Sequence, residues 1–182
     1  METANNNRGL IRFLGITLFV QAVTALVGGS IFLGPFDSSE ITDITLRSIN
    51  DSSGIGYISI LLQMITAVVI IMLGVAMYRA AGHINKTIGI IALSLYIFEA
   101  ALLALAQVFI FGLVEVSILF SASSDMNLIG LGEVLIASKD FASQIAMIPF
   151  GIGAILFYFL LLKAEIVPKW MALWGILTVP FI

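Results

Sequence analysis

One acidic side chain, Glu99, lies inside a long apolar stretch of the sequence, YIFEAALLAL at residues 96–105. An ionised side chain costs about 2.5 to 3.5 kcal/mol at the centre of a bilayer on insertion scales. Such residues therefore face the interior of a helix bundle, where they are partnered or protonated and often mark ion pathways and proton relays. Any chemistry inside this apolar part of the chain would have to use Glu99.

Three further polar residues accompany Glu99 in the apolar stretches. On a helix, Tyr96 lies one turn from Glu99, and Gln107 falls within roughly 80° of the same face at about 100° per residue. The candidate intramembrane polar site comprises Glu99, Gln107, Tyr96 and Gln63. Two interpretations stay open: a proton or substrate site, or a protonated acid that is hydrogen-bonded to Gln63 or another neighbour and serves packing.

The remaining residue types exclude most other chemistry. The chain has no cysteine, so it has no disulfide, no thiolate ligand and no cysteine nucleophile. Its one histidine, His83, cannot form a histidine pair around a haem or a metal. The segment GLGE at residues 130–133 weakly resembles the GxGD element of intramembrane aspartyl proteases, but it has Glu in place of Asp and no second embedded acid. We therefore predict no metal site, no cofactor and no catalytic residue.

Composition predicts the class of element that must position these side chains. Hydrophobic residues make up 60% of the 182 residues and charged residues 10%, whereas soluble domains have about 25% charged residues. A water-soluble fold is excluded, and a helix needs about 20 apolar residues to cross a bilayer. Such stretches occupy residues 11–33, 55–78, 88–113 and 141–162, and a fifth, incomplete one begins at 170–182. They lack the alternation of barrel strands, so we predict an all-α transmembrane bundle in one domain, residues 1–182.

Lys and Arg residues predict the orientation, because cytoplasmic loops carry the excess of positive charge. A cytoplasmic N-terminus places six of the eight basic residues inside: Arg8, Arg12, Arg79, Lys86, Lys163 and Lys169. Arg47 and Lys139, with most of the acids, then lie outside. We predict a multi-pass protein of the cell membrane, with the lipid bilayer as a partner. Its basic residues are too sparse for a nucleic-acid partner.

The connections between the predicted spans differ in length. The inner ones, residues 79–87 and 163–169, are short and predict antiparallel hairpins. The outer ones, residues 34–54 and 114–140, are longer, and each has a pattern that predicts a short surface helix, with an ordinary loop as the alternative. The first pattern has a helix start at Asp37 and Glu40 and a stripe of Ile41, Ile44 and Ile49; the second is formed by Leu128, Leu131 and Leu135.

Small residues and one proline affect the packing of the third predicted span and the geometry of the fourth. Ala100 and Ala104 form a small-xxx-small pair beside Glu99, which lets a neighbouring helix approach closely. Pro149, with Gly151 and Gly153, interrupts the fourth span. Transmembrane helices tolerate both residue types, so we expect a kink there in preference to a broken helix.

Two segments resemble a known family. The segment IVPKWMALWGIL, residues 166–177, is similar to the Pro-basic-Trp and Trp-Gly signature of domain of unknown function 4386, an uncharacterised family of multi-pass bacterial membrane proteins. Residues 78–105 resemble the second turn and third span of that family, including Glu99 and Ala100. The residues of the signature predict an anchor at the membrane interface, formed by Pro168, Lys169, Trp170 and Trp174.

The resemblance implies a membrane architecture and no activity. Members of the family often carry Arg one turn before the acid, where this chain has Tyr96. They also continue through a completed fifth span and a sixth, so we expect the gene product to continue beyond Ile182. Three functions remain, in decreasing order: a binding or accessory subunit that docks another membrane protein, a proton-linked small-molecule carrier that uses Glu99, and an intramembrane enzyme.

Overall fold

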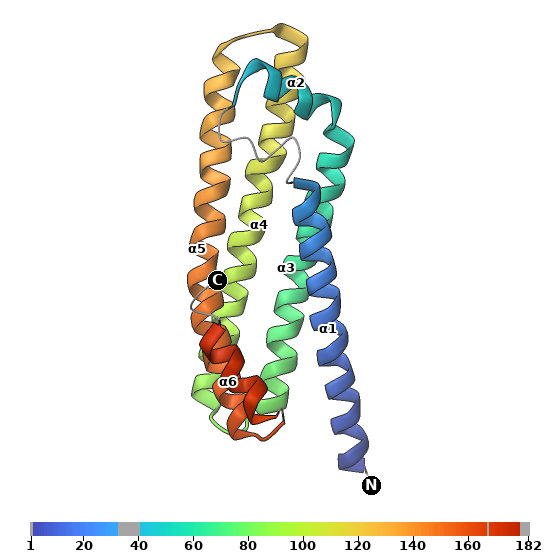
Figure 1. Ribbon diagram of the computed structural model, residues 1–182, viewed down its shortest axis with the longest axis vertical. Helices are drawn as coiled ribbons and strands as arrows, with labels where there is room; N and C mark the ends of the chain where they lie inside the picture. Colours follow the sequence, from blue (N-terminus) through green and yellow to red (C-terminus); the bar gives the residue numbers. More distant parts are fainter. Residues whose placement is uncertain (1, 33–40, 167, 179–182) are drawn as a thin grey trace. The chain divides into compact units, whose positions relative to one another are not determined.

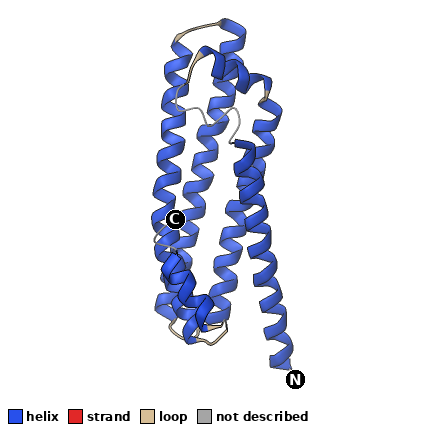
Figure 2. Cartoon of the chain, in the orientation of Figure 1, coloured by secondary structure: helices blue, strands red, loops and turns tan. Residues whose placement is uncertain are grey.

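The computed structural model describes residues 2–32, 41–166 and 168–178 (Figure 1). The helices of this part of the chain are α1 (Glu2–Phe32), α2 (Asp43–Asp51), α3 (Ser53–Ala81), α4 (Lys86–Ser123), α5 (Asn127–Lys163) and α6 (Lys169–Thr178). Figure 2 shows helices joined by turns, without a strand among the described residues. The predicted all-α class is confirmed.

Three helices are long and apolar enough to cross a membrane, counted over the described residues: α3, α4 and α5. They contain the stretches predicted as the second, third and fourth spans. The first predicted span falls on α1, where the apolar part found among the described residues is shorter, Arg12–Gly28. Helix α6 covers the beginning of the fifth stretch, and residues 179–182 lie outside the described residues.

The prediction that residues 114–140 form a long connection is wrong. Helix α4 continues to Ser123 and α5 already begins at Asn127, so only three residues separate them. Leu128, Leu131 and Leu135 are helical, but they belong to α5 and not to a separate surface helix. The polar residues of this region ended the apolar stretches, but they do not end the helices, because a helix can continue outside the hydrocarbon core.

Helix α2 forms in the first predicted outer connection, and its start is stabilised locally. The Oγ1 atom of Thr42 accepts a hydrogen bond from the backbone N–H of Thr45 at 3.2 Å, which caps the helix. Ile41, just before the cap, and Leu46, in the first turn, are both buried in one cluster, as in a hydrophobic staple. The predicted helix start at Asp37 and Glu40 lies outside the described residues.

The predicted apolar stripe of α2 is wrong at one position. Ile41 and Ile49 are buried, but Ile44 is 74% exposed and Leu46 is buried instead. The two positions differ by about 200° around a helix that turns about 100° per residue, so they face opposite sides once the helix begins at Asp43.

The described residues group into two compact units. Unit 1 comprises the described residues of Met1–Gln21, Ala67–Ala101 and Ile145–Ile182, and unit 2 those of Ala22–Thr66 and Leu102–Gln144. Helices α1, α3, α4 and α5 each contribute one part to unit 1 and one part to unit 2.

The hairpin of α3 and α4 in unit 1 confirms one of the predicted short connections. Asn85 caps α4, since its Oδ1 atom accepts a hydrogen bond from the N–H of Ile88 at 3.1 Å. A methyl group added at Gly89 would lie 2.9 Å from Cδ2 of Tyr78 and 3.1 Å from Cα of Gly82. The two helix ends therefore approach so closely that glycine is required at the contact.

Helix α5 ends in unit 1 with a Schellman motif. The N–H of Ile166 bonds the carbonyl of Leu161 at 3.4 Å, and the N–H of Glu165 bonds the carbonyl of Leu162 at 3.3 Å. Glu165 has a positive φ of 54°, a conformation for which glycine is the usual residue.

Candidate functional site

Glu99 lies on the buried face of α4. Residues seven apart along this helix are all buried: Ala92, Glu99, Ala106, Leu113 and Phe120. Glu99 itself is 5% exposed. This spacing returns to nearly the same face of the helix after two turns, so the carboxyl group occupies a position that a packed helix normally gives to an apolar side chain.

Tyr96 lies one turn before Glu99, and its ring fills a slot between two helices of unit 1. A methyl group added at Gly153 of α5 would lie 2.9 Å from Cδ2 of Tyr96, and one added at Gly74 of α3 would lie 3.2 Å from its Cβ atom. The ring also meets Phe157 of α5 edge-on, with 5.2 Å between the ring centroids. Two glycines and one phenylalanine thus fix the Tyr96 ring beside Glu99.

The Glu99 carboxyl group is incompletely hydrogen-bonded. Its Oε2 atom is buried and has no hydrogen-bond partner among the described residues. Leaving an ionised carboxylate in this condition costs several kcal/mol. The arrangement can therefore hold a proton on Glu99, or use it to bind a polar group that enters the unit.

The structure assigns Gln63 to the contact between α1 and α3 in unit 2. A methyl group added at Gly28 would lie 3.2 Å from Cδ of Gln63. Beside this contact the Ser59 hydroxyl donates to the Gly28 carbonyl at 3.0 Å, and the hydroxyl groups of Thr66 and Thr24 are 2.8 Å apart in a hydrogen bond. Such bonds between helices stabilise bundles in a membrane, which gives Gln63 a place in an interhelical polar contact.

Gln107 belongs to unit 2, although it shares α4 with Glu99. Its Oε1 atom is buried and, within the described part of the chain, has no hydrogen-bond partner. Of the four residues predicted for the polar site, the structure thus brings Tyr96 and Glu99 together in unit 1 and puts Gln63 and Gln107 in unit 2.

Sequence reasoning missed Gly74, Gly153 and Phe157 as parts of the site. The sequence predicts a kink at Pro149 and Gly153 and no contact with Tyr96. The helix runs through both residues, since α5 is continuous from Asn127 to Lys163. Glycines within two apolar stretches could have indicated these positions, since small residues mark close contacts between membrane helices.

A second candidate site is the head of unit 2, which we define as α2 with residues 113–123 of α4 and 127–140 of α5. Its core joins Ile41, Leu46 and Ile49 to Leu113, Val114, Val116 and Phe120 of α4, with Leu128, Ile129, Leu135 and Ile136 of α5 packed against it. A methyl group added at Gly132 would lie 2.9 Å from Cγ2 of Ile41, so this glycine lets α2 dock on α5.

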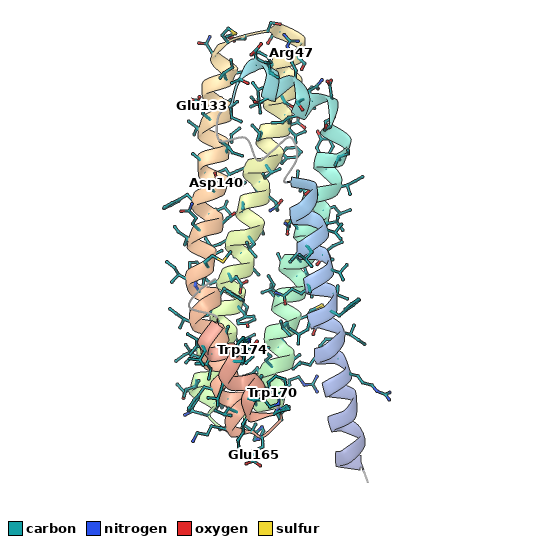
Figure 3. All side chains as sticks on the ribbon, in the orientation of Figure 1. Arg47, Glu133, Asp140, Glu165, Trp170 and Trp174 are labelled. Carbon is teal, nitrogen blue, oxygen red and sulfur yellow. The ribbon has the colours of Figure 1, made fainter. Side chains whose placement is uncertain are left out.

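Polar contacts hold the helices of unit 2 together around this core. The Arg47 guanidinium of α2 lies 5.4 Å from the ring centroid of Phe120 and donates to Ser124 at 3.4 Å. The Tyr57 hydroxyl of α3 donates to Glu115 of α4 at 2.7 Å. Figure 3 labels Arg47 on α2, and Glu133 and Asp140, both exposed, on α5.

The two units differ in the sign of their net charge. The sequence ranges of unit 2 contain eight of the eleven acids and two of the eight basic residues, a net charge of −6. Those of unit 1 contain six basic and three acidic residues, a net charge of +3. The chain's overall charge of −3 therefore conceals an acidic unit and a basic unit.

The predicted interface anchors lie at the start of α6. Pro168 is exposed and directly precedes the helix, where proline is tolerated because its missing N–H would have no helical acceptor. Lys169 is also exposed, and Trp170 and Trp174 project from α6 (Figure 3). Indole rings prefer the headgroup level of a bilayer, which fits an anchoring role.

Comparison with known proteins completes the description of these sites. A search among curated proteins and a search among solved structures each found no match. One family model, described as Domain of unknown function (DUF4386), matches residues 13–182. Because this match covers well over half of the sequence and includes α3, α4, α5 and α6, the chain belongs to the DUF4386 family.

Proposed function

We propose that this chain is a binding or accessory subunit of a membrane complex, inserted in the cell membrane as a multi-pass protein with its N-terminus in the cytoplasm. The three long apolar helices support membrane insertion. The basic residues support the orientation, since the turn between α3 and α4 and the turn between α5 and α6 are both flanked by Lys or Arg.

The length of α5 carries the proposal. Residues 141–162 of this helix give about 33 Å at about 1.5 Å per residue, which fills a hydrocarbon core of about 30 Å. Residues 127–140 add about 21 Å of continuous helix before that stretch. This extension then lies outside the hydrocarbon core, on the extracytoplasmic side, as part of the head of unit 2.

The extension exposes apolar side chains where lipid would not cover them. Leu131 and Val134 are exposed, and Val134 has 62% of its surface accessible. Glu133, between them in the sequence, and Asp140, further along the same helix, are exposed acids, and the head belongs to the acidic unit. A partner with an apolar contact surrounded by basic residues would match this surface in both hydrophobicity and charge.

The experiment is site-specific photo-crosslinking in native membranes. A photoreactive residue at Val134 is compared with one at Leu61 of α3, which is equally exposed at 62% but lies in an apolar span. We expect a discrete protein adduct from position 134 and lipid adducts from position 61. Glu133→Lys should reduce the protein adduct at least about tenfold, because like charges brought together cost several kcal/mol.

Two results would contradict the accessory role. Lipid adducts alone at position 134 would place the extension inside the bilayer. Adducts only with a second copy of the chain would show self-association and not a partner protein.

A proton-linked carrier of small molecules is the second candidate function, and one observation favours it: the buried, unpartnered Oε2 atom of Glu99. Carriers commonly use an embedded acid as a proton relay. Proton-linked uptake into vesicles should then be lost in Glu99→Gln, whereas Glu133→Gln, on the exposed part of α5, should leave it unchanged. Uptake that persists in Glu99→Gln would reject this function.

A further inference from the structure

A backbone carbonyl of α5 loses its helical hydrogen-bond donor in unit 1. Pro149 is buried inside this helix. Because proline has no N–H, it cannot donate to the carbonyl of Ile145, four residues earlier. The helix continues on both sides of this position, so the Ile145 carbonyl keeps its helical direction and can accept a hydrogen bond from another group.

The alignment of α4 with α5 places Glu99 level with this carbonyl along the helix axes. The short turn after Ser123 makes α4 and α5 antiparallel, and Tyr96 of α4 meets Gly153 of α5. Both helices rise about 1.5 Å per residue. Three residues further along α4, at Glu99, the neighbouring height on α5 is that of Pro149 and Phe150. The Ile145 carbonyl points toward the same height, because a helical carbonyl is directed at the residue four positions later.

We propose that Glu99 is an intramembrane proton-binding site, in which the acid form donates a hydrogen bond to the Ile145 carbonyl that Pro149 leaves free. Both groups belong to unit 1: Oε2 of Glu99 has no hydrogen-bond partner among the described residues, and the Ile145 carbonyl receives no hydrogen bond from Pro149. One added proton converts the carboxylate, which can only accept, into a donor.

The surroundings favour a proton over a metal cation. Hard cations take several oxygen ligands, and the described residues contain no group of three or more side chains suited to a metal. The titratable side chain that interacts electrostatically with Glu99 is Tyr96 of α4, and Tyr158 of α5 interacts in turn with Tyr96. In the described parts of α1 and α3 in unit 1, the cations Arg12 and Arg79 are exposed, so they do not compensate a buried negative charge.

Infrared difference spectroscopy of the reconstituted protein tests this site without a transport assay. We expect a protonated-carboxyl C=O band that persists at neutral pH and disappears in Glu99→Gln. Pro149→Ala supplies an N–H to the Ile145 carbonyl, so the band should move to higher frequency as its hydrogen bond weakens. Ile148→Ala, a neighbouring change at an exposed position that retains its N–H, should leave the band in place.

Three outcomes would overturn the proposal. The first is the absence of this band in the unmodified protein at neutral pH, which would mean that Glu99 is ionised. The second is a band that Pro149→Ala leaves unchanged, which would assign the carboxyl another partner. The third is loss of the band when sodium is added, which would show a metal cation at the site. Should Glu99→Gln fail to fold, the comparison of Pro149→Ala with Ile148→Ala still tests the hydrogen bond to the Ile145 carbonyl, because both variants retain Glu99.

Discussion

In unit 1, a tightly packed aromatic ring lies beside an acid whose hydrogen bonding is incomplete. The Tyr96 ring is fixed by Gly74, Gly153 and Phe157, whereas the carboxyl group of Glu99, one turn away, keeps an oxygen without a partner in the described structure. Close packing stabilises a membrane helix bundle, because lipid offers no hydrophobic driving force between helices. A buried acid that lacks a hydrogen-bond partner destabilises the bundle. Any function of Glu99 therefore comes at a cost in stability.

The Tyr96 slot gives a stability prediction. Tyr96→Ala should destabilise the protein by about 3 to 5 kcal/mol, because it removes a buried ring and leaves a cavity between α3 and α5. Tyr96→Phe should cost much less, since the ring still fills the slot. Thermal unfolding in detergent measures both variants. Equal losses in the two would show that the hydroxyl group matters and that the fit of the ring does not.

At the scale of elements, the docking of α2 depends on one glycine of α5. A methyl group added at Gly132 would crowd Ile41, whereas one added at Gly130, two residues earlier in the same helix, would meet nothing within 4 Å. The GLGE segment that weakly resembled a protease element therefore contains a packing position. Its acid, Glu133, is exposed.

The two glycines form a matched pair of variants. Gly130→Ala should be neutral or stabilise by up to about 1 kcal/mol, because alanine favours a helix. Gly132→Ala should destabilise by about 1 to 3 kcal/mol, because its methyl group overpacks the contact with Ile41. Hydrogen exchange should also show faster exchange in α2 for Gly132→Ala alone. Identical behaviour of the two variants would contradict the docking of α2 on α5.

The end of α5 provides a second test of an element. Glu165 has a left-handed conformation that costs a residue with a side chain about 1 to 2 kcal/mol. Glu165→Gly should therefore stabilise the protein by about 1 kcal/mol in thermal unfolding. Ala164→Gly, at the neighbouring position without a positive φ, serves as the control and should not stabilise. A loss of stability in Glu165→Gly would mean that the Glu side chain makes a contact that outweighs the backbone strain.

At the scale of the whole molecule, the distribution of charge connects orientation to function. The basic residues belong mainly to unit 1 and the acids mainly to unit 2. A cytoplasmic N-terminus then gives an acidic extracytoplasmic head, which is the surface assigned to a partner under the proposed accessory role. Reversal of the orientation would remove the physical basis for that assignment.

Single cysteines test the orientation, because the natural sequence has none. Asn85→Cys lies in the exposed turn between α3 and α4, and Met126→Cys lies in the exposed turn between α4 and α5. In intact cells an impermeant thiol reagent should label Met126→Cys and leave Asn85→Cys unlabelled until the membrane is permeabilised. The opposite labelling pattern would reverse the predicted topology.

Local patterns in the sequence determined the class of the protein and its central acid. The apolar stretches, the scarcity of charge and the short connection near His83 predicted helices and one hairpin, because helix formation and membrane burial depend on neighbouring residues. The same apolar stretches identified Glu99 as an embedded acid, and the helical period placed Tyr96 one turn from it.

Only the tertiary structure decided what the side chains meet. Gln63 was a candidate partner of Glu99 in the sequence, but it packs at Gly28. Leu46 and not Ile44 enters the core of unit 2, and Gly74 and Gly153 form the slot for Tyr96. The residues predicted as a loop before Phe141 extend α5. These outcomes depend on contacts between segments far apart in the chain and on where each helix begins, and neither is contained in the composition or periodicity of any one segment.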